Sequence, residues 1–376
     1  MAMDIPAVGV EEEYQLVDPN SGAMRADCKR VMRRLNGKVT AEIQHELHLS
    51  QIEMASPICH TLDEAQQSLV DTRQALSRAA MQTGAALSAA GTNPLPLPHT
   101  DDITPKERYN RMTQQYQQLA RDLFIFGCHV HVSMPDRVLG LEVMNRARRW
   151  LPALLAITAN SPFWDGHDTG YASYRRELWA QWPMAGPPPH FQSYADYQET
   201  IADLIQVGAI ADESFIYWDV RLPEKIPTIE FRVADVMLHV EDVVAYVGLI
   251  RAIVMQTQVD MDDRVTQEPI CNQLLRHAMW QAARYGVSEK LIDPVEKKPL
   301  DAHRLLGRLF DWCAPVLKQS GDVDRVESFL HRLSQHGNGA MKQREWAGNS
   351  LDFSEAVRCC VRETAHGISL ADCSSQ

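Results

Sequence analysis

Strand-like sequence fills most of the first two-thirds of this chain, whereas the last third has the periodicity of helices. Alternating apolar and polar residues predict extended segments at residues 8–17, 39–58, 123–133, 215–222 and 228–233. Apolar residues at helical spacing predict helices at about residues 240–258, 271–285, 301–318, 323–335 and 353–364. Strands and helices that are segregated along a chain favour an α+β fold over a doubly wound parallel sheet. We expect one domain over residues 1–376, with a sheet-rich core at about 5–240 and a mainly helical part at about 241–376.

Two helices are also expected inside the sheet-rich part. Thr61 can cap a helix N-terminus, and Glu64 completes a capping box. Gly91 and the prolines that follow it predict where this helix ends. A second helix is predicted at about residues 142–157, and a Gly-, Pro- and aromatic-rich stretch follows it at residues 160–189.

The charge balance of the chain is acidic, with 49 Asp and Glu against 37 Lys and Arg and a formal net charge of −12. This balance argues against a nucleic-acid partner, because neutralising phosphates requires clustered Lys and Arg. No apolar run is long enough to span a membrane. The eight cysteines form no C-x-x-C pair, which predicts free thiols in a reducing cytosol and a cytoplasmic location.

Three consecutive glutamates, Glu11 to Glu13, lie inside the apolar strand pattern of residues 8–17. An acidic triplet is most often a solvated strand edge. Strand alternation, however, places Glu11 and Glu13 on one face, about 6.7 Å apart along the strand, and Glu12 on the other. Two carboxylates at that spacing repel by about 2 kcal/mol at an effective dielectric near 20. A half-buried pair must therefore gain a cation or raise a pKa, and Mg²⁺ or Mn²⁺ is the simplest solution.

Two further glutamates, Glu46 and Glu53, occur in the second extended segment. The nearby His45 and His48 are one residue too close together for the H-E-x-x-H zinc motif. Glu46 and Glu53 are seven residues apart, so on one flat strand their side chains would point to opposite faces. They can reach one site only if the chain bends or bulges near Ser50; otherwise one of them is a surface residue.

A pair of histidines, His129 and His131, shares one face of the third extended segment. Two histidines on one face, next to a glycine that permits close approach (Gly127), favour a ligand site over a purely structural role. Cys128 faces the apolar side and is expected to be a packed thiol, since nothing near it lowers its pKa.

Glu230 and Arg232 share a face of the last predicted strand. Two interpretations of this pair remain open. In one, Arg232 forms a salt bridge across the strand pair, for instance with Asp219. In the other, Glu230 is a metal carboxylate beside an arginine that binds phosphate.

The stretch at residues 159–176 is rich in aromatic, glycine and arginine residues, a composition that is typical of functional loops. Arg175 and Arg176 are candidates for binding a phosphate or a substrate carboxylate, and at least one of them is expected to be only a surface charge. The sequence has neither a G-x-x-x-x-G-K-[ST] loop nor a G-x-G-x-x-G motif after a strand. A bound nucleotide would therefore be held by metal ions and arginines.

Taken in order, these segments resemble the bacterial type-two glutamate–cysteine ligases, also called carboxylate–amine ligases, of the glutamine-synthetase-like superfamily. The matching segments are Val8–Tyr14, Glu46 with Ser50–Glu53, Gly127–Val132, Ala159–Trp164 with Asp168–Arg175, Tyr217–Arg221, and Glu230–Asp235. They span about residues 8–235, and the ordered set is far more specific than any single segment. A tail segment, Gly337–Arg344, also resembles the family, whose pattern has Arg where Lys342 stands, and its role stays open.

The resemblance implies a curved antiparallel sheet that forms a funnel around metal ions, and ATP-dependent amide-bond formation. It implies that two or more Mg²⁺ or Mn²⁺ ions are held by six side chains: Glu11, Glu13, Glu46, Glu53, His129 and Glu230. It implies two catalytic arginines, Arg176 and Arg232, of which Arg232 meets the transferred phosphoryl group. It implies contacts to nucleotide or substrate from four further residues: Arg175, His131, Asn160 and Tyr217.

The resemblance also implies small-molecule partners. These are ATP, an amino-acid carboxylate such as glutamate and an amine such as cysteine, with weak formation of γ-glutamylcysteine through an acyl phosphate. The alternatives are the same chemistry on another acid and amine, a non-catalytic homologue that binds ATP and metal, and a metal-dependent hydrolase. The apolar stripes of the helical part could also pack against a second copy of the chain, which would give a homodimer.

Overall fold

The computed structural model describes residues 4–35, 39–97 and 102–369. Its centre is an antiparallel sheet in the order β10-β11-β5-β1-β3-β2, with β4 paired to the end of β1. The strands of this sheet are β1 (Val8–Val17), β2 (Glu42–His45), β3 (Gln51–Ala55), β4 (Ala86–Ser88), β5 (Gly127–Ser133), β10 (Val220–Arg221) and β11 (Thr228–Asp235). The predicted antiparallel α+β architecture is confirmed by these pairings.

Helices separate the strands in the first part of the chain and dominate the last part. The helices before residue 240 are α1 (Cys28–Arg34), α2 (Leu62–Met81), α3 (Glu107–Tyr116), α4 (Gln118–Arg121), α5 (Arg137–Ala147), α6 (Leu151–Thr158), α7 (Tyr174–Trp179) and α8 (Tyr194–Gln206), with a 3₁₀ turn at Glu213–Phe215. The later helices are α9 (Val240–Asp262), α10 (Asn272–Tyr285), α11 (Ala302–Ser320), α12 (Val323–His336), α13 (Gly339–Ala347) and α14 (Phe353–Thr364). Three short strand pairs complete the fold: β6 (Phe163–Trp164) with β7 (His167–Asp168), β8 (Ala185–Gly186) with β9 (Tyr217–Trp218), and β12 (Lys290–Asp293) with β13 (Lys298–Asp301).

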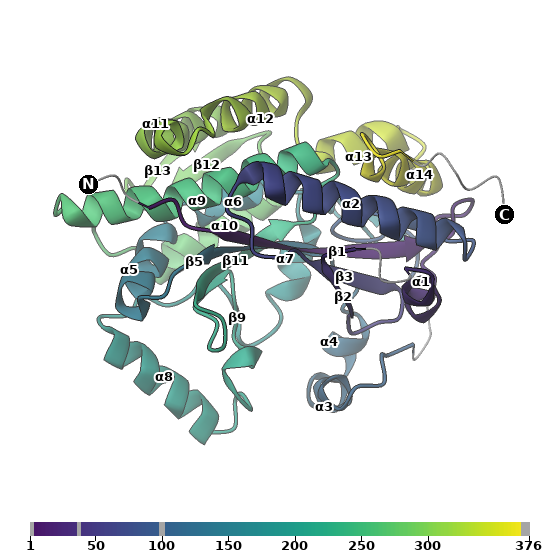
Figure 1. The fold of residues 1–376 in the computed structure, drawn as a ribbon, viewed down its shortest axis with the longest axis horizontal. Helices are drawn as coiled ribbons and strands as arrows, with labels where there is room; N and C mark the ends of the chain where they lie inside the picture. Colours follow the sequence, from purple (N-terminus) through teal and green to yellow (C-terminus); the bar gives the residue numbers. More distant parts are fainter. Residues whose placement is uncertain (1–3, 36–38, 98–101, 370–376) are drawn as a thin grey trace.

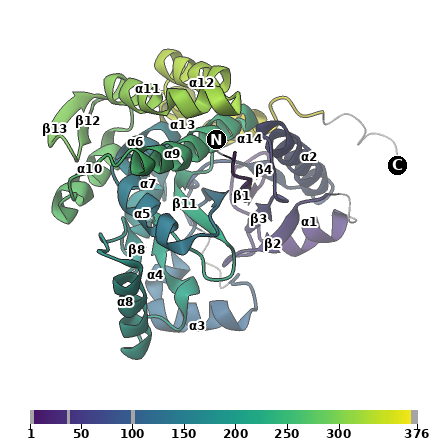
Figure 2. The same cartoon turned by 60° about the vertical axis from the view of Figure 1, so that its left-hand side comes forward.

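Helices α2 and α9 cover one face of the sheet, and α11 and α12 pack on α9 from outside (Figure 1). Helix α9 is buried through most of its length because it is enclosed between the sheet and these outer helices. Helices α3, α4 and α8 lie on the other side of the sheet (Figure 2). The sheet therefore has one face sealed by helices and one face that borders a pocket.

One hydrophobic cluster runs from Val8 of β1 to Leu333 of α12 and includes both the sheet-rich and the helical part. Such continuity is what a single domain over residues 1–376 requires, and that division of the chain stays a prediction. Within the described ranges, no helix combines the length and the apolar character needed to cross a membrane. The seven cysteines that the structure describes are free thiols, as expected, and Cys373 lies outside the described residues.

The helix predicted from the capping box begins as expected but ends early. The Thr61 hydroxyl accepts a hydrogen bond from the Glu64 backbone at 3.2 Å, and the Glu64 side chain accepts from the backbone of Thr61. The helix ends at Met81, so the expected end at Gly91 was wrong. Gly84, with a φ of +79°, follows the last turn and redirects the chain into β4, whose pairing with β1 competes with further helix.

Other corrections also follow from tertiary pairing. The helix predicted at residues 142–157 is broken between α5 and α6, and Pro152 in the first turn of α6 has no N–H with which to continue α5. The extended segment at residues 39–58 is a hairpin of β2 and β3. The strand predicted at residues 215–222 divides at Asp219, because β9 pairs with β8 and β10 with β11. From residue 240 onward, five helices match the prediction to within about one turn, whereas α13 and the β12–β13 pair were not foreseen.

A buried ion pair joins the sheet to its helical cover. Glu12 points from β1 toward α2, where both its carboxylate and the guanidinium of Arg73 are fully buried. Arg73 Nε lies 3.1 Å from a Glu12 oxygen, and Arg73 Nη1 donates to the backbone carbonyl of Leu238 at 2.6 Å. The hydroxyl of Tyr14 also donates to Glu12. The pair therefore ties together β1, α2 and the segment that enters α9.

We expect Arg73→Met to destabilise the protein by about 3–5 kcal/mol, because it leaves the Glu12 carboxylate buried without a counter-charge. The double variant Glu12→Gln/Arg73→Met should recover much of that loss, since it removes both charges. Denaturant unfolding of the two variants measures both effects. Arg111→Met, which breaks an exposed ion pair with Glu107, is the control and should cost less than about 1 kcal/mol. An Arg73 variant as stable as wild type would contradict this account.

Candidate active site

The register of the sheet gathers acidic and histidine side chains on the face that the long helices leave open. Side chains on one strand face recur at every second residue, so directly opposed residues of neighbouring strands point the same way. The opposed pairs across β3, β1, β5 and β11 are Glu53 with Glu13, Glu11 with His129, and His131 with Glu230. The face predicted from the alternation of β1 is thus the face that carries the site.

Three carboxylates form the first group of this site. The chain turns at residues 49–50, which meets the condition for both glutamates to reach one site, and the turn carries Glu46 back to Glu53. Oxygens of Glu13, Glu46 and Glu53 all lie within 4.8 Å of one another. Burial, together with the charges of Glu46, Glu11 and Glu13, raises the pKa of Glu53 well above its usual range. These carboxylates are crowded in a way that a divalent cation would relieve.

Glu11 and the two histidines form the second group. His129 Nδ1 lies 3.0 Å and His131 Nε2 lies 3.3 Å from the oxygens of Glu11. Burial alone would raise the pKa of Glu11, but its hydrogen bonds to both histidines and their charges hold that pKa far below its usual range. Burial and the nearby Arg232 lower the pKa of His129, whereas Glu230 and Glu11 outweigh burial and raise the pKa of His131. Donor atoms of both histidines approach those of Glu11, so geometry does not separate a metal-binding histidine from a substrate-binding one.

Glu230 is held by two arginines. Arg221 Nε donates to Glu230 at 2.6 Å, and Arg232 pairs with the same carboxylate. Burial would raise the pKa of Glu230, but these two guanidinium groups hold it well below its usual range. The salt bridge between Arg232 and Asp219 is not formed: Arg232 gives Asp219 only a backbone hydrogen bond, and the Asp219 carboxylate lies 3.4 Å from Arg176 instead.

Arg175 and Arg176 point in different directions from α7. Arg175 lines the pocket that the acidic groups border, and its guanidinium lies 3.8 Å from Asp235. A Cβ on Gly127 would collide with that guanidinium, so the close approach that this glycine allows serves Arg175. Arg176 borders a separate pocket beside α10, together with Arg276. Both side chains are buried, so the expectation that one of them is a surface charge was wrong.

Asp235 organises the loop that carries Arg175. Its carboxylate accepts hydrogen bonds from the backbone of Asn160 at 2.8 Å and from the hydroxyls of Ser161 and Ser173 at 2.7 and 2.8 Å. It is fully buried. A single carboxylate at the end of β11 therefore fixes both ends of the 160–175 stretch against the sheet.

Of the two remaining residues expected to contact nucleotide or substrate, the structure brings only Tyr217 into the pocket. The hydroxyl of Tyr217 is buried and has no hydrogen-bond partner among the described residues, so it is free to meet a ligand. Asn160 lies elsewhere, where its amide donates to the backbone carbonyls of Ala89 and Val236. Its oxygen accepts from Gln343 at 2.7 Å.

The tail segment packs on that same loop. Asn338 caps α13 by accepting from Met341, and Gln343 reaches Asn160. Arg344 pairs with Asp168 at 2.7 Å. The segment thus acts as a brace behind the loop, and its side chains are absent from the lining of the acidic pocket.

The pocket has a volume of about 270 Å³ and contains residues that the sequence did not single out. Arg221 belongs to a segment that matched the family, but nothing in the sequence indicated its pairing with Glu230. Arg108 and Tyr109 belong to α3, a helix that was not predicted, and Trp179 is the last residue of α7. No local sequence pattern marks these residues as part of the site, since only folding brings their helices to the sheet.

The donor set fits divalent cations that prefer oxygen. Three groups of side chains each place one donor atom within 4.8 Å of the others, and Glu53 belongs to two of them. Carboxylates dominate these groups, which suits Mg²⁺, and the histidine nitrogens suit Mn²⁺ at least as well. The guanidinium groups of Arg175 and Arg232 line the same pocket, where a phosphate could meet cations and arginines together.

Solved structures with this fold include two enzymes of glutathione chemistry. A glutamate–cysteine ligase from Francisella tularensis, solved in complex with AMP, superposes with a TM-score of 0.70 at 14% identity and covers 97% of this chain and 90% of its own. A bifunctional glutathione synthetase from Pasteurella multocida also gives a TM-score of 0.70, at 15% identity, over 96% of this chain and 52% of its own. At such identities the likeness concerns the fold alone, and it agrees with the antiparallel sheet and helical part expected from the sequence.

Sequence comparison gives closer relatives. A protein of Rhodopirellula baltica named "Putative glutamate--cysteine ligase 2" is 56% identical over 376 residues, covering 99% of this chain and 100% of the relative. A protein of Mycobacterium sp. strain KMS, named "Putative glutamate--cysteine ligase 2-2", is 43% identical over 356 residues, covering 94% and 97%. The family described as glutamate–cysteine ligase family 2 matches residues 7–356. These matches cover the sheet, the acidic pocket and most of the helical part, and this chain therefore belongs to glutamate–cysteine ligase family 2.

Proposed function

We propose that this protein is an ATP-dependent ligase that joins a carboxylate to an amine through an acyl phosphate, with weak glutamate–cysteine ligase activity. The observation that carries the proposal is the juxtaposition of crowded carboxylates and His129 with Arg175 and Arg232 in one pocket, with His131 beside Glu11. Membership of the family supports the reaction class. The fold shared with solved ligases of glutathione chemistry is consistent with it.

Glu13, Glu46 and Glu53 would hold one divalent ion, and Glu11 with the histidines and Glu230 would hold a second. Divalent ions bound there would neutralise the phosphates of ATP and polarise the phosphoryl group that is transferred. Arg232 would contact the transferred group, because its guanidinium lies beside Glu230 at the edge of the second donor group. Arg175, held near Asp235, would orient a phosphate or the acid substrate.

The reaction would proceed in two transfers. An oxygen of the substrate carboxylate attacks the terminal phosphorus of ATP, the bond to the bridging oxygen breaks, and ADP leaves. The amine nitrogen then attacks the acyl carbon, the carbon–oxygen bond to phosphate breaks, and phosphate leaves while the nitrogen loses a proton. Positioning and charge neutralisation are the main contributions of the protein to such steps. In this scheme Arg176 would contribute indirectly, through the buried Asp219 to which it is paired.

We expect Glu13→Gln and Glu230→Gln each to abolish ADP release while the protein stays folded. Each change removes a charged ligand from a different donor group and leaves a side chain of equal size. ADP release with ATP, glutamate, cysteine and Mg²⁺ measures the first effect, and thermal unfolding measures the second. Glu42→Gln, an exposed glutamate on β2, is the matched control. ADP release at the wild-type rate from either variant would remove that residue from the metal site.

The raised pKa of Glu53 predicts a pH-dependent stability that metal should reverse. The folded protein holds a proton on Glu53 above the pKa of about 4.3 that the unfolded chain has, so this group makes the metal-free protein less stable as the pH rises. In a chelator, Glu53→Gln should therefore raise Tm over wild type by about 2 °C or more, and the gain should be larger at pH 7 than at pH 5. With Mn²⁺ the order should reverse.

Scanning calorimetry of wild type, Glu53→Gln and Glu42→Gln, with chelator or Mn²⁺ at both pH values, measures this effect. Glu42→Gln should respond to Mn²⁺ as wild type does. Equal stabilisation of wild type and Glu53→Gln by Mn²⁺ would exclude Glu53 from metal binding.

A screen of paired acids and amines for ADP release with Mg²⁺ should give a signal for glutamate with cysteine that requires both substrates. A different pair that clearly exceeds it would replace the named activity and keep the reaction class. Phosphate release without any amine would instead indicate a hydrolase. Failure to bind ATP with Mg²⁺ in calorimetry would indicate a non-catalytic homologue.

A further inference from the structure

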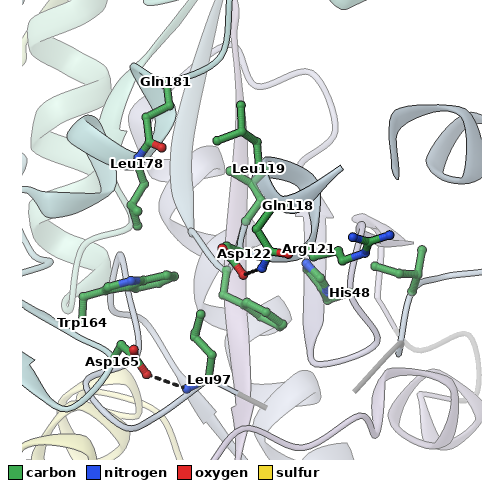
Figure 3. Close-up of a pocket in the computed structure, with 13 residues that line it drawn as sticks. His48, Leu97, Gln118, Leu119, Arg121, Asp122, Trp164, Asp165, Leu178 and Gln181 are labelled. Carbon is green, nitrogen blue, oxygen red and sulfur yellow. Dashed lines mark hydrogen bonds between the residues drawn. The ribbon is translucent and has the colours of Figure 1, made fainter. Parts of the chain in front are cut away.

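A pocket of about 410 Å³, the second pocket, adjoins the acidic pocket at Leu123, and its lining is drawn in Figure 3. Its apolar wall comes from Leu97, Ile103, Leu119, Leu123, Phe124, Trp164 and Leu178. Its polar lining comes from His48, Gln118, Arg121, Asp122, Asp165 and Gln181. Trp164 and Leu178 stand on one side in Figure 3, facing Leu119 and Asp122 on the other. Nothing in the two transfers described above uses this space.

The two pockets share a wall. Leu123 borders both of them. Three pairs of consecutive residues also divide between the two pockets. Leu47, Ile125 and Trp179 border the acidic pocket, and their chain neighbours His48, Phe124 and Leu178 border the second pocket. A ligand in the second pocket would thus lie next to one that is being phosphorylated at the acidic groups.

The charges of the second pocket differ from those needed to hold a polyphosphate. Asp122 and Asp165 line it against one guanidinium, that of Arg121. Asp122 accepts from Gln118 at 2.7 Å, and Asp165 accepts from the backbone of Leu97 at 3.2 Å. Two carboxylates beside one arginine would repel phosphates but would attract a cationic amine, and Arg121 could pair with a carboxylate on that amine.

The floor of the pocket offers a flat aromatic surface with unused polar atoms. His48 stacks on Phe124 with ring centroids 3.8 Å apart and an interplanar angle of 20°. His48 is 1% exposed, and its ring nitrogens have no close hydrogen bond, although the backbone of Ala120 interacts with the ring. Burial lowers the pKa of His48 to about 4, so the ring is neutral near pH 7 and can offer one donor and one acceptor. A buried ring at the edge of a cavity, with hydrogen-bonding capacity left over, is a feature that a ligand would satisfy.

We propose, resting on the ligase function proposed above, that this second pocket binds the amine substrate, and that this substrate is a primary amine with an apolar or aromatic body larger than the side chain of cysteine. The amine would enter with its nitrogen at the Leu123 edge, where the acyl phosphate lies, and with its body between Trp164 and Leu119. A pocket of this volume is of the size that holds drug-sized ligands, and cysteine would leave most of it empty. Weak activity with cysteine follows from that misfit.

The test compares two amines in wild type and in a variant whose second pocket is filled. ADP release is measured at saturating ATP, Mg²⁺ and the acid that gives the highest rate, with cysteine or phenylethylamine as the amine. Leu119→Trp places an indole in the space that the body of the amine would occupy. Leu330→Trp is the matched control, because Leu330 is likewise a half-buried leucine packed against the core but lines none of the pockets described above. Calorimetry of phenylethylamine binding is the second readout.

The proposal predicts that wild type has a kcat/KM for phenylethylamine at least about tenfold above that for cysteine, since a single additional methylene in an apolar pocket is worth about tenfold or more. Leu119→Trp should lower the value for phenylethylamine by about tenfold or more and weaken its binding in calorimetry, with KM for ATP within about twofold of wild type. Leu330→Trp should match wild type in all of these values.

Two kinds of outcome overturn the proposal, and a third rejects the ligase function while it keeps the amine site. A rise in KM for ATP in Leu119→Trp with an unchanged preference among amines would identify the pocket as the place of the nucleobase. A wild-type preference for cysteine, or a Leu119→Trp variant that handles phenylethylamine as wild type does, would show that no amine body lies there. Binding of phenylethylamine that Leu119→Trp abolishes, without ADP release from any pair, would keep the amine site and reject the ligase function instead.

Discussion

The alternation of side chains along the central strand β1 decides which of its charges face the helical cover and which face the pocket. Three consecutive glutamates on β1 cannot all face the same way, because strand side chains alternate. Glu12 turns toward the helical cover and is neutralised there by Arg73, while Glu11 and Glu13 turn toward the pocket. A slip of one residue in the register of β1 would bury two unpaired carboxylates under α2 and remove both from the site. The pairing of Glu12 with Arg73 thus fixes the register on which the pocket depends.

Much of the site was predictable because its logic is local. Alternation alone separated Glu12 from its neighbours and paired His129 with His131. It also made a bend near Ser50 the condition for bringing Glu46 and Glu53 to one site, and the structure has that bend. The helices after residue 240 were predictable for the same reason, since each has its own periodicity. Order along the chain then indicated the family, which no single segment could do.

The remaining features depend on contacts between distant segments. Consecutive arginines on a helix point about 100° apart, and only the positions of Asp235 and Asp219 decide that Arg175 enters the pocket and Arg176 leaves it. The same holds for Arg221, whose partner lies on the neighbouring strand, and for the end of α2, where strand pairing by β4 competes with helix. Sequence patterns report the propensity of a segment, and tertiary pairing decides between segments of similar propensity.

The donor groups of the pocket differ in how much of their negative charge is already compensated, and therefore in how strongly they would attract a divalent cation. Glu230 is compensated by two arginines and Glu11 by two histidines, so a cation at that group must compete with partners that are in place. The group of Glu13, Glu46 and Glu53 is compensated less, since His129 approaches Glu13 only to 3.9 Å, and burial with the neighbouring carboxylates raises the pKa of Glu53. A first divalent ion therefore gains most there. In the proposed reaction, a second ion would gain when a phosphate arrives, because the negative charge of the phosphate would pair with Arg232 and free Glu230 to act as a ligand. The net acidity of the chain is thus compatible with the proposed triphosphate substrate, since the carboxylates at this site would act through cations bound to them.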